Sequence, residues 1–217
     1  LILSLLAATI VQNGSTAAPP SSKEEARWKL RLSEEDRSAV ESNLGHALPR
    51  FPEDVVWLGA SPFEGKTGVE GRVVVVQSWS HGNSRGRAVP RKLEKSLKSI
   101  EGADDLVVVL LHTPENADKA AAFMERSGSS YPVMLDASGR TCDAMGIYRR
   151  PVNLVVDRQG VIRYAGLHDR GLKSAVQKLL AEPRDASVTP KPHPADTVEA
   201  KTTAGEFPTF DNAVRSA

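Results

Sequence analysis

The chain has 217 residues, of which 40% are hydrophobic and 25% are charged, as in an ordinary globular protein. Its formal net charge of +1 excludes the overall positive field that many nucleic-acid-binding proteins use. The five His are scattered and form no Cys/His cluster, so the sequence predicts no metal site and no other cofactor. Cys142 is the one cysteine, which excludes a disulfide within the chain.

The first segment, residues 1–17, has the pattern of an export signal. Leu1 to Val11 form a short apolar run, and Ser15 and Ala17 fit a small-x-small cleavage site. We therefore expect an exported protein of the periplasm or cell envelope, with these residues as the remnant of a signal peptide. An uncleaved membrane anchor and a helix docked on the domain are the alternatives.

Two flanking segments are expected to lie outside the main domain. Residues 18–54 are expected to form a linker and a helical extension. Ser33 offers a side-chain acceptor at a helix start, and the acidic residues after it suit the positive end of the helix dipole. Residues 184–217 hold four prolines and few core-forming side chains up to 208, which favours a disordered linker.

Between these segments, apolar runs alternate with helical patterns, and the order is β-α-β, an α-containing insertion, a β-hairpin and a closing helix. Strands are expected at 54–61, 72–79, 105–112, 131–136, 151–157 and 161–166; helices are expected around Leu93, Leu97 and Ile100, from Thr113-Pro114-Glu115 to Gly128, at 139–148, and around Leu172 to Leu180. This order predicts a three-layer α/β sandwich.

A serine elbow is one reading of the turn after the second of these strands. Residues 82–86 spell G-x-S-x-G, the strand-to-helix turn that presents a nucleophilic serine in many hydrolases. Asp157 and His168 follow Ser84 in the chain order of such a catalytic triad. The alternative is structural, with Asn83 or Ser84 capping the helix that follows.

Two longer phrases resemble the thioredoxin-like superfamily, specifically exported redoxins of the AhpC/TSA and TlpA type, over residues 55–183. GRVVVVQSWS is similar to the family's strand before the active site, and SYPVMLDASGRTCDAMGIYRRPVNLVVDRQGVIRYAG is similar to the segment that contains its active-site proline. The resemblance implies thiol-disulfide oxidoreductase or peroxiredoxin-like activity, a cis-proline at Pro151 and a Trp79 that packs beneath the first long helix.

The chain departs from this family at the active-site turn, where relatives carry W-C-x-x-C. Alignment on Trp79 puts Asn83 and Gly86 at the two cysteine positions, with Arg87 next, and alignment on the helix proline puts Gly82 and Arg85 there. Neither pair contains sulfur. Since the family's chemistry needs a thiolate, we predict a catalytically degenerate site; a thiol redox role of Cys142, alone or with a partner, is the alternative.

A binding role needs no sulfur. The resemblance gathers His81, Arg85 and Arg87 opposite Arg149, Arg150 and Pro151, next to the N-terminus of the first long helix. Such a helix end attracts anions, and strand addition needs only backbone groups. We therefore predict a binding or scaffold module for an acidic or extended protein segment, with no nucleic acid and with membrane contact only through an N-terminal anchor. The alternative is that the arginines are merely solvated surface.

Overall fold

The computed structural model describes residues 23–52, 55–63, 69–100, 103–148 and 150–199. A six-stranded sheet with the order β1-β4-β3-β2-β5-β6 forms its centre. The strands are β1 (Val56–Leu58), β2 (Val73–Trp79), β3 (Leu106–His112), β4 (Val133–Leu135), β5 (Asn153–Val156) and β6 (Ile162–Ala165). The helices are α1 (Lys23–Ala26), α2 (Glu34–Glu41), α3 (Ser84–Leu97), η1 (Ala103–Asp105), η2 (Ala117–Lys119), α4 (Ala120–Ser127), α5 (Arg140–Ala144), α6 (Asp169–Ala181) and α7 (Pro194–Glu199).

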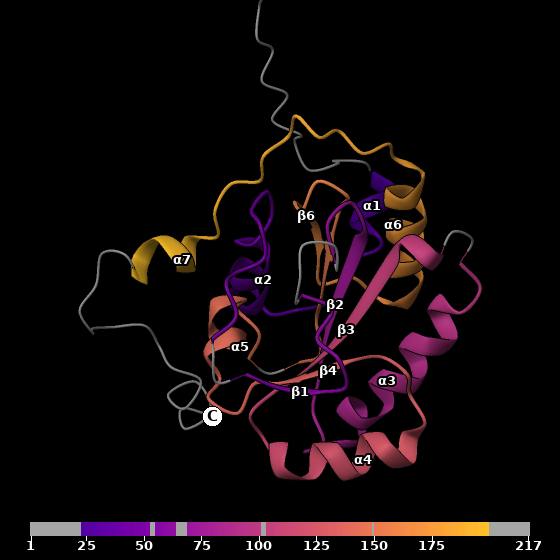
Figure 1. Cartoon of the computed structure of the whole chain (residues 1–217), viewed down its shortest axis with the longest axis vertical. Coiled ribbons are helices and arrows are strands. Elements are labelled where there is room, and N and C mark those ends of the chain that lie inside the picture. Colours follow the sequence, from indigo (N-terminus) through magenta and orange to yellow (C-terminus); the bar gives the residue numbers. More distant parts are fainter. Residues whose placement is uncertain (1–22, 53–54, 64–68, 101–102, 149, 200–217) are drawn as a thin grey trace, which may run out of the picture.

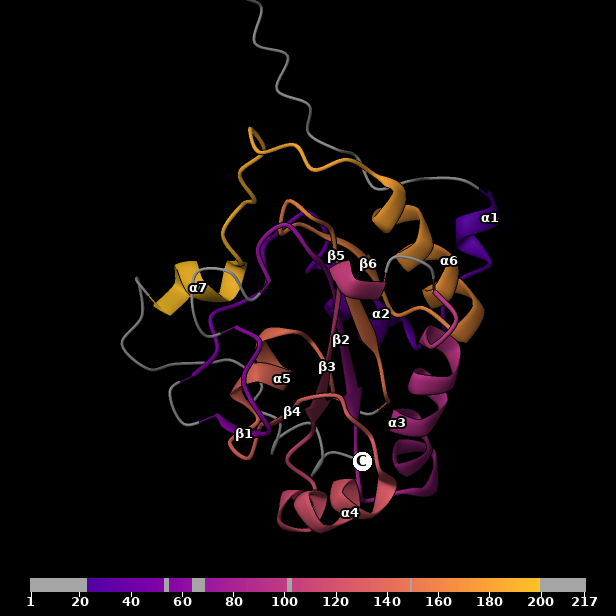
Figure 2. The same cartoon turned by 45° about the vertical axis from the view of Figure 1, so that its right-hand side comes forward.

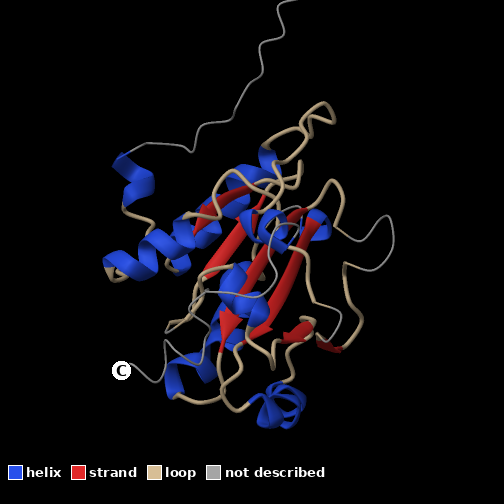
Figure 3. Cartoon of the chain, turned by 90° about the vertical axis from the view of Figure 1, so that its left-hand side faces the viewer, coloured by secondary structure: helices blue, strands red, loops and turns tan. Residues whose placement is uncertain are grey.

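The helices cover both faces of the sheet, as Figures 1 and 3 show. One core cluster joins α3, α4 and α6 to one face, and a second joins α2 and α5 to the other. This arrangement confirms the expected three-layer α/β sandwich. The first core includes Leu93 of α3 and Leu172 of α6, and the second includes Val40 of α2 and Met145 near α5.

The central strands confirm the expectation of burial on both faces. Every residue of β2 is buried, and β2 pairs in parallel with β3 and antiparallel with β5. A β-branched run without polar alternation suits such a position because both faces of the strand meet helices. β5 and β6 form the expected antiparallel hairpin, with an irregularity at Val155 and Val156.

The helix expected to begin at Thr113-Pro114 begins later. The Thr113 N–H donates to the carbonyl of Trp79 at 3.0 Å, which holds this segment at the end of β2. Asn116 has φ of 57°, a left-handed conformation that interrupts a helix. As a result η2 begins at Ala117 and α4 at Ala120, while Gly128 ends α4 as expected, with φ of 67°.

Residues 184–199 differ from the expected disordered linker, because this segment runs along the body of the protein. Lys191 bridges to His46, and its carbonyl accepts from Ala47 N–H at 2.8 Å. His193 is only 3% exposed, and its Nε2 lies 2.9 Å from Oδ1 of the buried Asn43. Backbone pairing and one buried side chain hold this segment on the domain. The amino-acid composition of the segment indicates neither of these contacts. Residues 200–217 lie outside the described part of the chain.

The N-terminal extension also packs on the domain. Ser33 caps α2 as expected, since its Oγ accepts from Asp36 N–H at 3.1 Å. Glu25 of α1 pairs with Lys178 of α6 at 2.8 Å, and Trp28 lies against Tyr164 with ring centroids 6.1 Å apart. The expected signal remnant at 1–17 lies outside the described residues. Among the helices that the structure does describe, none has the length and apolar character to cross a membrane.

Candidate functional site

The turn between β2 and α3 satisfies its own polar groups. Asn83 is the N-cap of α3, and its Oδ1 accepts from Gly86 N–H at 2.8 Å. Ser80 Oγ accepts from Gly82 N–H at 3.0 Å, and Arg87 Nη1 donates to the carbonyl of His81 at 2.8 Å. Of the two caps that the sequence left open, the structure selects Asn83; Ser84 is the exposed first residue of the helix.

The turn has no room for a side chain at Gly86. A Cβ atom there would lie 2.2 Å from the carbonyl oxygen and 2.9 Å from the amide nitrogen of Ser80. These are backbone atoms, so the turn itself would have to move. A Cβ at Gly82 would lie 2.3 Å from the carboxyl group of Glu115, a flexible side chain that can move aside. In the alignment on Trp79, the second cysteine position, Gly86, is therefore closed by the backbone. Gly82, the first position of the other alignment, is covered only by the Glu115 side chain.

Trp79 and His112 form the floor of this turn. They are paired in register at the ends of β2 and β3, both are 0% exposed, and their rings meet edge to face at 4.4 Å. Trp79 belongs to the core cluster beneath α3, as expected, and also contacts Phe123 of α4 at 5.4 Å. Nε2 of His112 accepts from His81 N–H at 2.9 Å and thereby fixes the turn.

His112 is held in its neutral form. Burial lowers the pKa of His112 from 6.5 to about 4; the backbone of Thr113 acts in the opposite sense, and His81 lowers the pKa further. The side-chain nitrogens Trp79 Nε1 and His112 Nδ1 are buried without a hydrogen-bond partner among the described residues. His112 was not among the expected site residues, although its position at the end of a strand parallel to β2 could have indicated that it lies beside Trp79.

The expected binding residues are only partly brought together. Ser78 and Val152 exchange hydrogen bonds of 2.8 Å, which places Pro151 at the end of β2, beside the turn. Arg85 and Arg87 are exposed at the start of α3. Arg150 is exposed too, but its Nη1 donates to the carbonyl of Arg31 at 3.2 Å, toward the N-terminal segment.

One expectation that followed from the family resemblance is not met at this edge of the sheet. The peptide bond before Pro151 is trans, not cis. The trans form is the ground state of most prolyl bonds, and Val152 reaches its partner Ser78 with this bond in place. Arg149, the other arginine expected here, lies outside the described residues.

Comparison with known families agrees with this fold. Residues 63–165 match the AhpC/TSA family. This segment belongs to the AhpC/TSA family of thioredoxin-like proteins. None of the curated proteins matches the sequence.

Solved structures confirm the thioredoxin-like fold of the chain. A thioredoxin-like superfamily protein is 18% identical with a TM-score of 0.54 and covers 64% of this chain and 99% of its own. A thioredoxin-like protein in the oxidized form has 21% identity, a TM-score of 0.52 and coverage of 64% and 97%. A putative protein disulfide isomerase from Bacteroides thetaiotaomicron is 22% identical with a TM-score of 0.50, and the match covers 64% of this chain and 91% of that protein. At these identities the likeness concerns the fold.

The cysteine of the matched segment lies away from the turn. Cys142 is 0% exposed in the core between α2, α5 and the sheet, and its N–H donates to Asp136 Oδ2 at 2.7 Å. Burial raises the pKa of the Cys142 thiol well above its ordinary value, and the Asp136 carboxylate raises it further. A buried, protonated thiol is a poor nucleophile, so this geometry opposes a redox role for Cys142.

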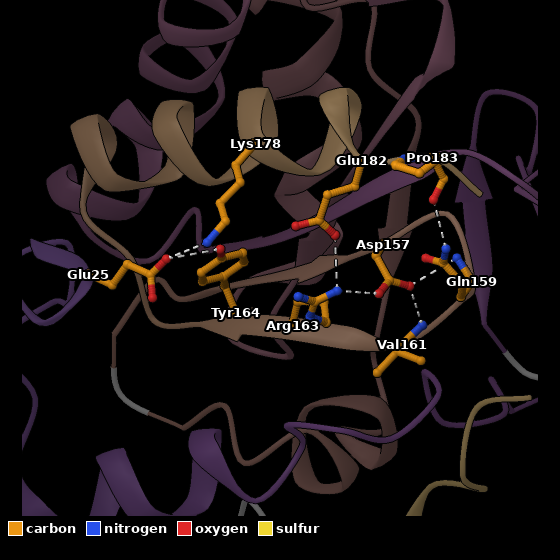
Figure 4. Close-up of polar contacts among 9 residues, drawn as sticks. All are labelled: Glu25, Asp157, Gln159, Val161, Arg163, Tyr164, Lys178, Glu182 and Pro183. Atoms are coloured by element: carbon orange, nitrogen blue, oxygen red, sulfur yellow. Dashed lines mark hydrogen bonds and ion pairs between the residues drawn. The ribbon is translucent and has the colours of Figure 1, made fainter. Parts of the chain in front are cut away.

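The serine-hydrolase alternative is contradicted by the positions of its three residues. Val156 pairs with Val74, so Asp157 lies at the start of β2, whereas Ser84 follows its end, about 20 Å away along the strand. Asp157 instead accepts from Gln159 and Val161 N–H groups at 2.9 Å and pairs with Arg163 at 3.0 Å, as Figure 4 shows.

The third member of the proposed triad is also committed to structure. His168 is the N-cap of α6, where its Nδ1 accepts from Gly171 N–H at 3.2 Å. Its Nε2 lies 2.7 Å from the carbonyl of Arg27. With both ring nitrogens engaged and Asp157 bound elsewhere, the two residues cannot serve Ser84. Among the described residues, no group of three or more His, Cys, Asp or Glu is placed to hold a metal ion.

Proposed function

We propose that this AhpC/TSA-family protein is a binding or scaffold module that recognises an acidic or extended protein segment at the β2–α3 turn without exchanging disulfides. The observation that carries the proposal is the closed position at Gly86, where the backbone of Ser80 leaves no space for a cysteine side chain. The chain's single thiol, Cys142, is buried in the opposite layer. A thioredoxin-like turn without accessible sulfur keeps only its shape and charge.

The shape and charge of the turn favour an acidic partner. The first turn of α3 contains no acidic residue, and the helix of 14 residues directs the positive end of its dipole at the turn. Arg85 and Arg87 flank this helix end and are exposed, and Arg150 lies on the neighbouring segment beside Pro151. Guanidinium groups bind carboxylates in paired hydrogen bonds, which gives direction as well as attraction.

One of the protein's own carboxylates limits access to the turn. Glu115 lies over Gly82, and its Oε2 is 3.4 Å from Ser80 Oγ. A partner carboxylate that approached Gly82 would meet this charge. Binding close to Gly82 therefore requires the exposed Glu115 side chain to move aside. If Glu115 stays in place, the partner contacts only Arg85 and Arg150.

A labelled acidic peptide tests the proposed site. Binding of a fluorescein-labelled oligoglutamate to the full chain is measured by fluorescence anisotropy at low salt. Arg85→Gln with Arg150→Gln is expected to raise the Kd about fivefold or more, because exposed charge pairs contribute up to about 1 kcal/mol each. Glu115→Gln is expected to lower the Kd.

The control carries the same charge change on another surface. Arg50→Gln with Lys191→Gln removes two exposed positive charges from the side of α2 and the C-terminal segment. Equal Kd values for this control, the Arg85/Arg150 variant and the original chain would contradict a site at the turn.

Export is the second part of the proposal. The apolar run from Leu1 to Val11 and the small residues at Ser15 and Ala17 support delivery to the periplasm or cell envelope. In an oxidising compartment a single buried cysteine, Cys142, is protected from intermolecular disulfides by its 0% exposure.

A further inference from the structure

The outer face of α3 exposes basic and neutral polar side chains and no acidic one that is fully exposed. Every exposed residue between 83 and 99 is Arg, Lys, Ser or Asn, and the basic ones are Arg85, Arg87, Arg91, Lys92, Lys95 and Lys98. The buried residues of the helix, Gly86, Pro90, Leu93 and Leu97, form the opposite stripe. A helix with 14 residues is about 21 Å long, so the six positive charges form a row across one side of the molecule.

The charges of this row are not neutralised by neighbours in the described part of the chain. Arg87 donates to a carbonyl, and the other five basic side chains form no ion pair with a described residue. Glu94 is the acidic residue of α3 and is half-buried at the margin, where it raises the pKa of Tyr131, behind the larger effect of burial. Lys173 of α6 extends the row, since its Nζ lies 2.9 Å from Ser99 Oγ.

The composition of the row separates three kinds of anionic partner. It exposes no aromatic side chain on which a nucleic-acid base could stack. An acidic peptide bound along the whole of α3 would have to order a much longer segment than one held at the turn alone, and each added exposed ion pair contributes little against that loss of chain entropy. A bilayer with anionic headgroups presents many charges at once, and each Lys or Arg near such a surface strengthens binding about fivefold.

We propose that the basic face of α3, with Lys173, binds the surface of a membrane that contains anionic phospholipids. The contact is electrostatic and peripheral, because the face exposes no large apolar side chain to insert. It goes beyond the peptide site at the turn, since most of its charge lies farther along α3.

The place of α1, the first described helix, supports this orientation. α1, α6 and α3 lie on the same side of the sheet (Figure 2). The apolar run at 1–11 is joined to α1 by residues 12–22, which can span at most about 40 Å when extended. If this run were retained as an uncleaved membrane anchor, the alternative to a cleaved signal, it would hold the side of the molecule that carries α1, α6 and α3 near the headgroups.

Vesicle co-sedimentation of the full chain tests the proposal. Vesicles of phosphatidylcholine with phosphatidylglycerol are compared with vesicles of phosphatidylcholine alone, at low and high salt. Arg91→Gln, Lys95→Gln and Lys98→Gln together are expected to weaken binding to the anionic vesicles about tenfold to a hundredfold. These residues lie away from the turn, so binding of oligoglutamate to Arg85 and Arg150 can fail or succeed independently.

A matched variant separates the face from the total charge. Arg31→Gln, Arg50→Gln and Lys191→Gln remove the same charge from exposed positions that lie toward the α2 layer, and this variant is expected to bind anionic vesicles like the original chain. If binding were the same with and without anionic lipid and at low and high salt, the apolar run alone would be responsible, and the proposal would be overturned. Equal loss in both triple variants, or binding of oligoglutamate to Arg91, Lys95 and Lys98 without any binding to vesicles, would overturn it too.

Discussion

Gly86→Ala is expected to lower the free energy of unfolding by about 3 kcal/mol, the upper end of what overpacking a well-packed site costs. The added methyl group would lie 2.2 Å from the carbonyl oxygen of Ser80, and this oxygen belongs to the turn that connects β2 to α3. Relief requires the backbone to move and to break the 2.8 Å hydrogen bond between Gly86 N–H and Asn83 Oδ1. Urea unfolding monitored by tryptophan fluorescence measures the change.

The control for this prediction lies in the same turn. Ser84→Ala changes an exposed residue at the first position of α3 and is expected to change the free energy of unfolding by less than about 0.5 kcal/mol. A Gly86→Ala variant as stable as the original chain would show that the turn accepts a side chain. Asn83→Cys with Gly86→Cys could then restore a pair of cysteines, an outcome that the close contact between Gly86 and the Ser80 backbone otherwise excludes.

Stability is expected to fall as the pH falls through the range set by His112. The folded-state pKa of His112 is about 4, below its ordinary value of 6.5, so the unfolded chain binds the proton first. The neutral imidazole therefore stabilises the fold fully above about pH 6.5, and this contribution is lost as the pH falls toward 4. Between pH 7 and pH 5 the loss is about 2 kcal/mol. Urea unfolding at a series of pH values measures it.

Substitution of the imidazole isolates its part of the pH dependence. His112→Gln keeps an acceptor for the His81 N–H and removes the titrating group, so the difference in stability between pH 7 and pH 5 should shrink by about 2 kcal/mol. His193, whose pKa is also lowered by burial, acts in the same direction and remains in both proteins. An unchanged pH dependence in His112→Gln would contradict the account of a buried neutral His112.

The sheet could be predicted from the sequence because its signals are local. β2 and β3 are long β-branched runs that suit only a position buried on both faces, and the three residues at 158–160 force the hairpin between β5 and β6. The start of η2 could not be predicted, because the contact of Thr113 with Trp79 joins positions far apart in the chain. The sequence Thr113-Pro114 is the same whether a helix begins there or several residues later.

The chemistry of the turn depended on contacts that one sequence does not reveal. The sequence showed that sulfur is missing at Asn83 and Gly86, but not that the backbone of Ser80 closes the second position. It placed His112 at the end of a strand without its partners Trp79 and His81. It assigned His193 to a linker, although Asn43, 150 residues away, binds it. Each of these depends on long-range packing rather than on local pattern.

We propose that the thioredoxin-like domain does not exchange disulfides, and the reduction of insulin by dithiothreitol in the presence of the full chain tests this proposal most directly. We expect the rate of insulin precipitation to equal that of dithiothreitol alone at every protein concentration, because Cys142 is the one thiol and is 0% exposed. A rate that rises in proportion to the protein and is lost in Cys142→Ser would contradict the account.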